Sequence, residues 1–216
     1  MIALLRYAYL KSVRDGSLIA FLLPATLVSL SGLSGVTLSQ GHRPHYPFFL
    51  NVQFSPVQNA TLAAQIAIAV SVLFAVIPAF WTFRPEISSR SIGSFFFATR
   101  PLTVALALIL FAAAVGLAGW IVSMAVIGVL TTALPTHMAL MALKVAAGCL
   151  AASAIGALVV TISPQPGAIV ISYVGCIALV PWIEKSKSSL QLIAAVAASI
   201  VCAALSAYLL ERRCAT

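Results

Sequence analysis

The stretch LTVALALILFAAAVGLAGWIVSMAVIGVL, residues 102–130, contains no charged side chain and decides the fold class. A helix that crosses about 30 Å of hydrocarbon needs roughly 20 apolar residues at about 1.5 Å each. Because the stretch exceeds that length, a single helix here must tilt, bend near Gly116 and Gly119, or protrude from the bilayer. The sequence therefore predicts an all-α protein whose helices cross a membrane.

The composition of the whole chain supports a lipid environment. Of its 216 residues, 62% are hydrophobic and 7% are charged, whereas soluble domains are roughly half apolar and about one quarter charged. The net charge of +8 comes from few basic residues, which lie between the apolar runs, so nucleic-acid binding is a poor interpretation. The four cysteines are far apart and predict neither a disulfide nor a metal site.

Five further apolar runs predict a polytopic protein that forms a single transmembrane domain over residues 1–216. The run at 168–183 is short for a full crossing and is also compatible with a re-entrant element. Small residues at Gly148, Ala152 and Gly156, and the alanine-rich run 194–207, indicate helix faces that pack closely within the chain or against a second copy. The six predicted spans are residues 17–38, 60–83, 102–130, 138–162, 168–183 and 190–210.

The distribution of Lys and Arg predicts the orientation of these spans. Basic residues concentrate in the connections that six spans would place on the side of the chain termini, and the positive-inside rule assigns that side to the cytoplasm. We therefore expect both termini in the cytoplasm and the chain in the inner (plasma) membrane. The basic residues on this side are Arg6, Lys11, Arg14, Arg84, Arg90, Arg100, Arg212 and Arg213, against Arg43, Lys185 and Lys187 on the other.

Residues 1–16 predict a helix that lies on the cytoplasmic membrane surface. At 100° per residue, one half of the helical wheel carries the charged residues and the other is mainly apolar, although Leu4 and Leu10 break the pattern. An alternative is that the segment is only the basic flank of the first span. The charged half holds Arg6, Lys11, Arg14 and Asp15, and the apolar half holds Ile2, Leu5, Ala8, Tyr9 and Val13.

The chain contains no nucleotide-binding loop, nucleophile elbow or metalloprotease motif. Within the predicted spans, Lys144 and Gln65 are the candidates for a substrate path, although the lysine can instead reach the interface and the amide can pack on a neighbouring helix. His42, His45 and His137 share the predicted outer side, but without an orienting carboxylate they predict surface histidines and no metal site.

Residues 84–101, RPEISSRSIGSFFFATRP, form the longest predicted cytoplasmic connection between spans. Pro85 suits the first turn of a helix, and the segment mixes charged with apolar side chains. The simplest interpretation is an interfacial helix. Its apolar side holds Ile87, Ile92, Phe95 and Phe96, beside Glu86, Arg90 and Arg100.

This connection resembles the permease subunits of type-2 superfamily ATP-binding-cassette (ABC) exporters. Those permeases carry a Glu, then a Gly followed by Thr or Ser, then a Pro that opens the third span, and Glu86, Gly93, Ser94 and Pro101 follow that pattern. The beginning of the chain, with Arg14, Asp15 and Pro24, resembles the opening of the same family. The chain departs from many relatives in having no Lys between Pro101 and Leu143.

The resemblance implies a transport subunit without an ATPase site of its own. A cytoplasmic coupling helix between spans 2 and 3, within residues 84–100, would contact an ABC ATPase present in two copies, which binds ATP and Mg. The residues implied for this contact are Glu86, Arg90, Gly93, Phe95 and Pro101. A second permease copy would complete a homodimer or a similar heterodimer. The alternatives are a membrane-embedded enzyme and a structural subunit of a membrane complex.

Overall fold

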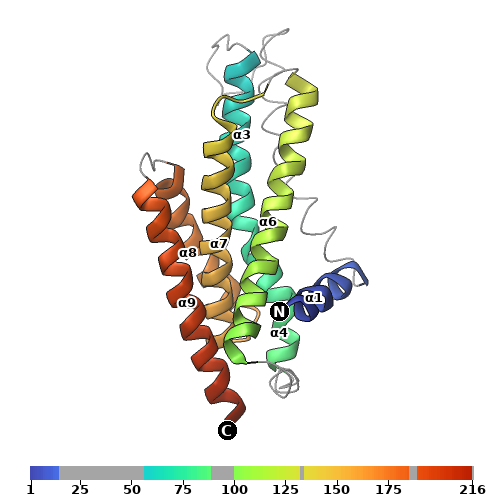
Figure 1. The fold of residues 1–216 in the computed structure, drawn as a ribbon, viewed down its shortest axis with the longest axis vertical. Helices are drawn as coiled ribbons and strands as arrows, with labels where there is room; N and C mark the ends of the chain where they lie inside the picture. Colours follow the sequence, from blue (N-terminus) through green and yellow to red (C-terminus); the bar gives the residue numbers. More distant parts are fainter. Residues whose placement is uncertain (15–55, 89–99, 132–133, 185–188, 216) are drawn as a thin grey trace.

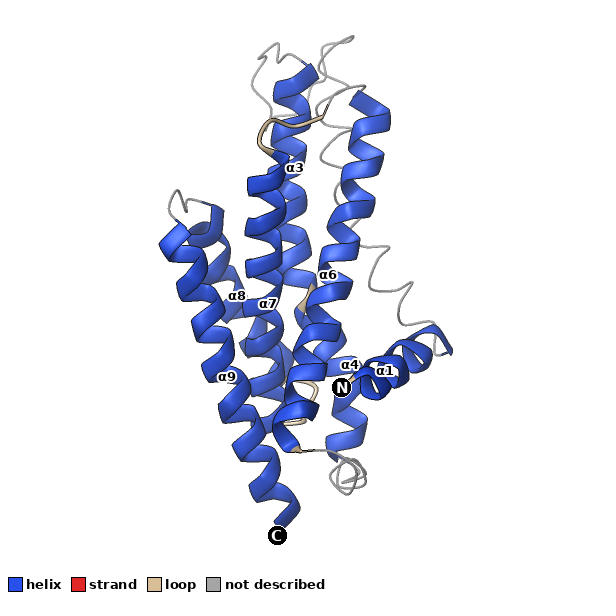
Figure 2. Ribbon diagram, in the orientation of Figure 1, coloured by secondary structure: helices blue, strands red, loops and turns tan. Residues whose placement is uncertain are grey.

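The computed structural model describes residues 1–14, 56–88, 100–131, 134–184 and 189–215. These residues form helices joined by turns, and the described part of the chain contains no strand (Figure 2). Long helices pack side by side into a bundle, and the shorter α1 lies beside its lower part (Figure 1). The prediction of an all-α fold is confirmed.

Helix α6, Pro101–Thr131, is the uncharged stretch that decides the fold class. Pro101 opens it, since a proline at the first helical position lacks only an N–H that has no partner inside the helix anyway. The carbonyl of Arg100 accepts the backbone N–H of Thr103 at 2.9 Å. The helix runs unbroken through Gly116 and Gly119, so its length of about 46 Å must be accommodated by tilt or protrusion.

Helix α7, Met138–Ile162, occupies the centre of the bundle (Figure 1) and matches the predicted span 138–162. It packs against α6, against the two helices formed by residues 56–74 and 76–88, and against the last two helices of the chain. Its small-residue face, Gly148, Ala152 and Gly156, is buried. The expectation that this face packs closely is confirmed, and the packing is within the chain.

The predicted span 60–83 is confirmed as an apolar stretch long enough to cross a membrane, Ala63–Trp81, but it does not form one uninterrupted helix. The structure divides it into α3, Pro56–Phe74, and α4, Val76–Ser88, which meet at Ala75. The second half also extends beyond the predicted end. The sequence prediction followed hydropathy alone, which does not change at this point.

Helices α8, Ala168–Glu184, and α9, Ser189–Ala215, complete the bundle. The first of these closely matches the predicted residues 168–183, and its apolar part, Ala168–Pro181, is shorter than a full span. In Figure 1 it does not reach as high as α3 or α6.

Four stretches among the described residues are long and apolar enough to cross a membrane. They are Ala63–Trp81, Pro101–Val129, Met138–Ile162 and Ile193–Arg212. These four, with the shorter α8, correspond to five of the six predicted spans. The first predicted span, residues 17–38, lies outside the described residues.

Candidate functional site

The junction of α3 and α4 is the first feature of functional interest, because a break inside a membrane helix leaves backbone groups without partners. Pro78, whose side chain is fully buried, lies in the first turn of α4 and has no N–H to donate to the carbonyl of Phe74. Its ring also crowds that carbonyl. This accounts for the break at Ala75. The proline inside an apolar run was the available sequence signal, and it went unused.

Helix α7 supplies hydrogen bonds to the backbone at this junction and one turn before it. The hydroxyl of Ser153 donates to the carbonyl of Ala75 at 3.3 Å, and the thiol of Cys149 donates to the carbonyl of Ser71 at 3.6 Å. The backbone N–H of Ala75 also donates to Ser71, at 3.0 Å. Side-chain donors from a neighbouring helix are what makes irregular backbone tolerable at membrane depth.

Helix α6 also approaches the break closely, and it does so at a glycine, Gly116. A Cβ added at Gly116 would lie 2.9 Å from both the Cβ of Ala75 and the sulfur of Cys149. Gly156 of α7 plays a similar part lower down, where an added Cβ would lie 3.3 Å from a methyl group of Val76. The break is therefore held between two helices that approach it closely only because these positions carry no side chain.

Below the break, α4 is tied to the connection between α7 and α8. The Nε of Arg84 donates to the carbonyl of Pro164 at 2.6 Å, a contact between residues 80 positions apart. Arg84 is half-buried, and Ile87 in the last turn is 5% exposed. The lower part of α4 is thus fixed both to the bundle and to residues 163–167, which precede α8.

The structure does not begin a helix at Pro85, and most of the predicted coupling segment, residues 89–99, lies outside the described residues. Pro85 lies inside α4, which continues to Ser88, and Glu86 lies in the last turn of the same helix. Pro101 is the first residue of α6, as the prediction had it. The other residues predicted for the coupling contact, Arg90, Gly93 and Phe95, lie outside the described residues.

Apart from Lys144, the basic residues named below lie on segments at the lower end of the bundle in Figure 1. Both chain termini lie at this end, as do the end of α4 and the start of α6. It holds Arg6, Lys11, Arg14, Arg84, Arg100 and Arg212. The segregation of charge expected from the sequence is therefore a property of the folded bundle.

Helix α1, Ile2–Arg14, packs against α6 and α4. Leu4, which breaks the predicted pattern, is buried against the bundle, whereas Ile2, Tyr9 and Val13 of the predicted apolar half are exposed. A helical wheel separates charged from apolar residues, but it does not show which side of the helix the bundle covers. Arg6 and Arg14 are exposed, Lys11 is half-buried, and Asp15 lies outside the described residues.

No family model matches the chain, and neither a curated protein nor a solved structure matches it significantly. Its function must be inferred from its own residues and geometry.

The two candidates for a substrate path lie far from the break. Gln65 is exposed on α3, so the described helices of the chain do not cover it. Lys144 is half-buried on the second turn of α7, toward the end of the bundle opposite the basic residues.

The predicted histidine positions provide no metal site among the described residues. His137, exposed just before α7 with φ of 60°, makes no side-chain cap hydrogen bond. No group of three His, Cys, Asp or Glu within the described ranges could hold a metal ion. His42 and His45 lie outside those ranges.

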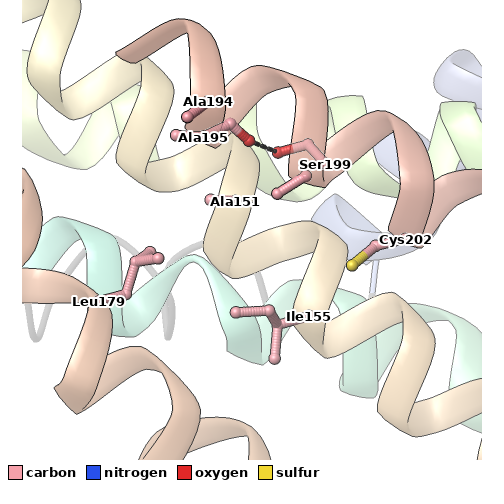
Figure 3. A pocket seen from close by; sticks show the side chains of 8 residues that line it. Ala151, Ile155, Leu179, Ala194, Ala195, Ser199 and Cys202 are labelled. Carbon is pink, nitrogen blue, oxygen red and sulfur yellow. Dashed lines mark hydrogen bonds between the residues drawn. The ribbon is translucent and has the colours of Figure 1, made fainter. Parts of the chain in front are cut away.

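A groove of about 340 Å³ lies between α7, α8 and α9 (Figure 3). Its main polar group is the hydroxyl of Ser199, which donates to the carbonyl of Ala195 at 2.7 Å. The groove therefore suits hydrocarbon and offers no charged group for catalysis or ion binding. Its lining consists of Ala151, Ile155, Leu179, Ala194, Ala195, Ala198, Ser199 and Cys202.

Proposed function

We propose that this chain is the transmembrane permease subunit of an ABC exporter, in which separate ATPase subunits bind ATP and Mg. The observation that carries the proposal is where the segments with the family resemblance lie. Helix α1, the end of α4 with Glu86, and Pro101 at the start of α6 all lie at the basic end of the bundle, although α1 is distant in sequence from the other two (Figure 1). An ATPase bound at that end would contact all of them.

In this proposal the basic end faces the cytoplasm, and six spans place both termini there. The ATPase contacts the connection between α4 and α6 through Glu86, Arg90, Gly93 and Phe95. Helix α4 then acts as a rigid segment below the break at Ala75, because packed helices shift as units. The hydrogen bond from Arg84 to Pro164 passes its displacement to the connection before α8.

A second permease copy forms the other half of the transporter, as a homodimer or a similar heterodimer. The exposure of Gln65 supports a further partner or an aqueous path on that side of α3. An amide that faces hydrocarbon loses its hydrogen bonds to water, so polar side chains inside membrane spans usually face protein or a water-filled cavity. The substrate path in this proposal includes Gln65 and Lys144.

The test is to purify the chain under mild conditions from cells that express it and to measure ATP hydrolysis in the complex. We expect an ATPase subunit to co-purify, and Glu86→Lys to abolish its association. Glu211→Lys is the matched control, because Glu211 is exposed near the end of α9 at the same end of the bundle. Retained ATPase association in Glu86→Lys would contradict the assigned contact.

A structural subunit of a larger membrane complex is the second candidate, favoured by the extensively exposed apolar surface of α9. It predicts co-purification with membrane proteins and no bound ATPase. A membrane-embedded enzyme predicts instead that the purified chain alone turns over a lipid or quinone.

A further inference from the structure

Helix α1 presents one face to the bundle. Leu4, Ala8 and Ser12 recur every four residues and are 6%, 1% and 1% exposed. This stripe lies on one side of a 13-residue helix, and the contacts of α1 are with α6 and α4. The position of α1 on the bundle is therefore fixed by a narrow face, which leaves most of its circumference uncovered.

A second face is apolar and exposed. Ile2, Tyr9 and Val13 are 81%, 52% and 49% exposed, and at 100° per residue their mean direction lies about 120° from the buried stripe. Exposed apolar side chains on one face of a short helix indicate contact with another apolar phase. The two apolar faces of α1 thus point in different directions, one of them away from the bundle.

The remaining arc of α1 carries its basic residues, with Leu10, which is 53% exposed, between the two arginines. Arg6 and Arg14 are exposed there, and the ammonium group of Lys11 lies 5.9 Å from the centre of the Tyr7 ring. The described helix contains no acidic residue. A helix that lies on a membrane surface beside the bundle would contact the bundle, the hydrocarbon and the polar headgroups on three successive sides. The buried, apolar and basic faces of α1 follow one another in the same order.

The same end of the bundle adds further positive charge. Arg100 is exposed next to the start of α6, and the guanidinium of Arg212 lies 5.4 Å from the centre of the Tyr208 ring on α9. These residues add positive charge on α9 and at the start of α6, and α6 contacts α1. A basic surface next to an exposed apolar face is the combination that anionic membranes attract.

We propose that α1 and the basic end of the bundle bind the headgroups of anionic phospholipids, so that anionic lipid holds α1 in place against α6 and α4. The inference does not depend on the ABC assignment. A bilayer fits better than an acidic protein segment, because it supplies a hydrocarbon phase for Ile2, Tyr9 and Val13 directly beneath the anionic layer that faces Arg6 and Arg14.

The experiment measures amide hydrogen exchange of residues 2–14 in the full chain, reconstituted into nanodiscs. One set contains phosphatidylcholine alone and the other contains phosphatidylcholine mixed with phosphatidylglycerol. We expect slower exchange in the anionic discs, by about five-fold for each basic residue that is engaged, with the difference reduced at high salt. Inorganic phosphate added to discs of phosphatidylcholine alone should give no protection, since it supplies no surface.

The double variant Arg6→Gln/Arg14→Gln should lose most of the protection that anionic lipid gives. Lys144→Gln is the matched control, since it removes a positive charge from the opposite end of the bundle and should keep the protection. Unchanged exchange in α7 of each variant verifies that the bundle is intact. Equal exchange in both kinds of disc, protection that persists in the double variant, or protection by phosphate alone would overturn the proposal.

Discussion

Helices α7 and α9 are alike in composition and hydropathy but differ in how much of each is buried by other helices. Both are rich in alanine, and their apolar stretches have mean hydropathies of 2.2 and 2.3, yet 67% of the first and 33% of the second is buried. Helix α7 lies at the centre of the bundle and α9 at its edge (Figure 1). Hydropathy therefore predicts that a helix lies in lipid, but it does not predict which other helices that helix contacts.

Serine side chains show the same difference. On α7, Ser153 donates to the backbone of another helix, at Ala75. On α9, Ser199 and Ser206 donate to Ala195 and Cys202, each four residues earlier in the same helix. Because lipid gives no hydrophobic drive for helix association, close approach and hydrogen bonds between helices carry the specificity. The structure shows both around α7, and the described serines of α9 bond only within that helix.

The largest effect should come from filling the contact between α6 and α7. Gly116→Val would place side-chain atoms where the Cβ alone meets Ala75 and Cys149 at 2.9 Å, so we expect a loss of about 3 kcal/mol or failure to fold. Unfolding in detergent micelles measures it. The control is Ala197→Val on the exposed face of α9, expected within about 0.5 kcal/mol. Equal losses would contradict the contrast between the two helices.

A smaller loss should follow from Arg84→Gln, which removes the guanidinium that binds the Pro164 carbonyl after the end of α7. Hydrogen bonds of charged groups contribute about 1.5–3 kcal/mol, and partial exposure lowers this, so we expect about 1–2 kcal/mol. Arg212→Gln removes an exposed cation from the ring of Tyr208 on α9 and should cost about 0.5 kcal/mol. The prediction fails if Arg212→Gln lowers the free energy of unfolding as much as Arg84→Gln does.

The smallest difference in the free energy of unfolding should be between the effects of removing two serine hydroxyls. Ser153→Ala removes the donor to Ala75 beside the helix break, and we expect a loss of about 0.6–1 kcal/mol in the free energy of unfolding. Ser199→Ala removes a hydroxyl that bonds only within α9 and should change stability by less than about 0.5 kcal/mol. A paired measurement in the same detergent resolves the two, and a larger loss for Ser199→Ala would reverse the interpretation.

The sequence predicted the long helices well and their irregularities poorly. Residues 102–130, 138–162 and 168–183 correspond closely to α6, α7 and α8, because an uncharged run must form its backbone hydrogen bonds internally in lipid. The break at Ala75 was missed because Pro78 does not lower hydropathy. Pro85 suits the first turn of a helix, but the structure places it inside α4, and the local sequence does not distinguish these two positions.

The buried face of α1 illustrates the same limit at the surface of the bundle. A wheel separates charged from apolar residues, but it does not reveal that Leu4 is covered by protein while Ile2 is exposed. Both side chains are apolar, so only the direction of the neighbouring helices distinguishes them. The candidate site likewise depends on Gly116, Cys149 and Ser153, none of which carries a signal in the sequence that links it to Ala75.

The sequence by itself determined that the chain is helical, that its long apolar helices suit a membrane, and where most of the described helices begin and end. These properties follow from the local balance of charge and hydrocarbon, which each segment carries alone. The tertiary structure decided which faces meet, which side chains contact the break in the second span, and that Arg84 binds the connection before α8. Such contacts join residues far apart in the chain, and packing distances of a few ångström select them.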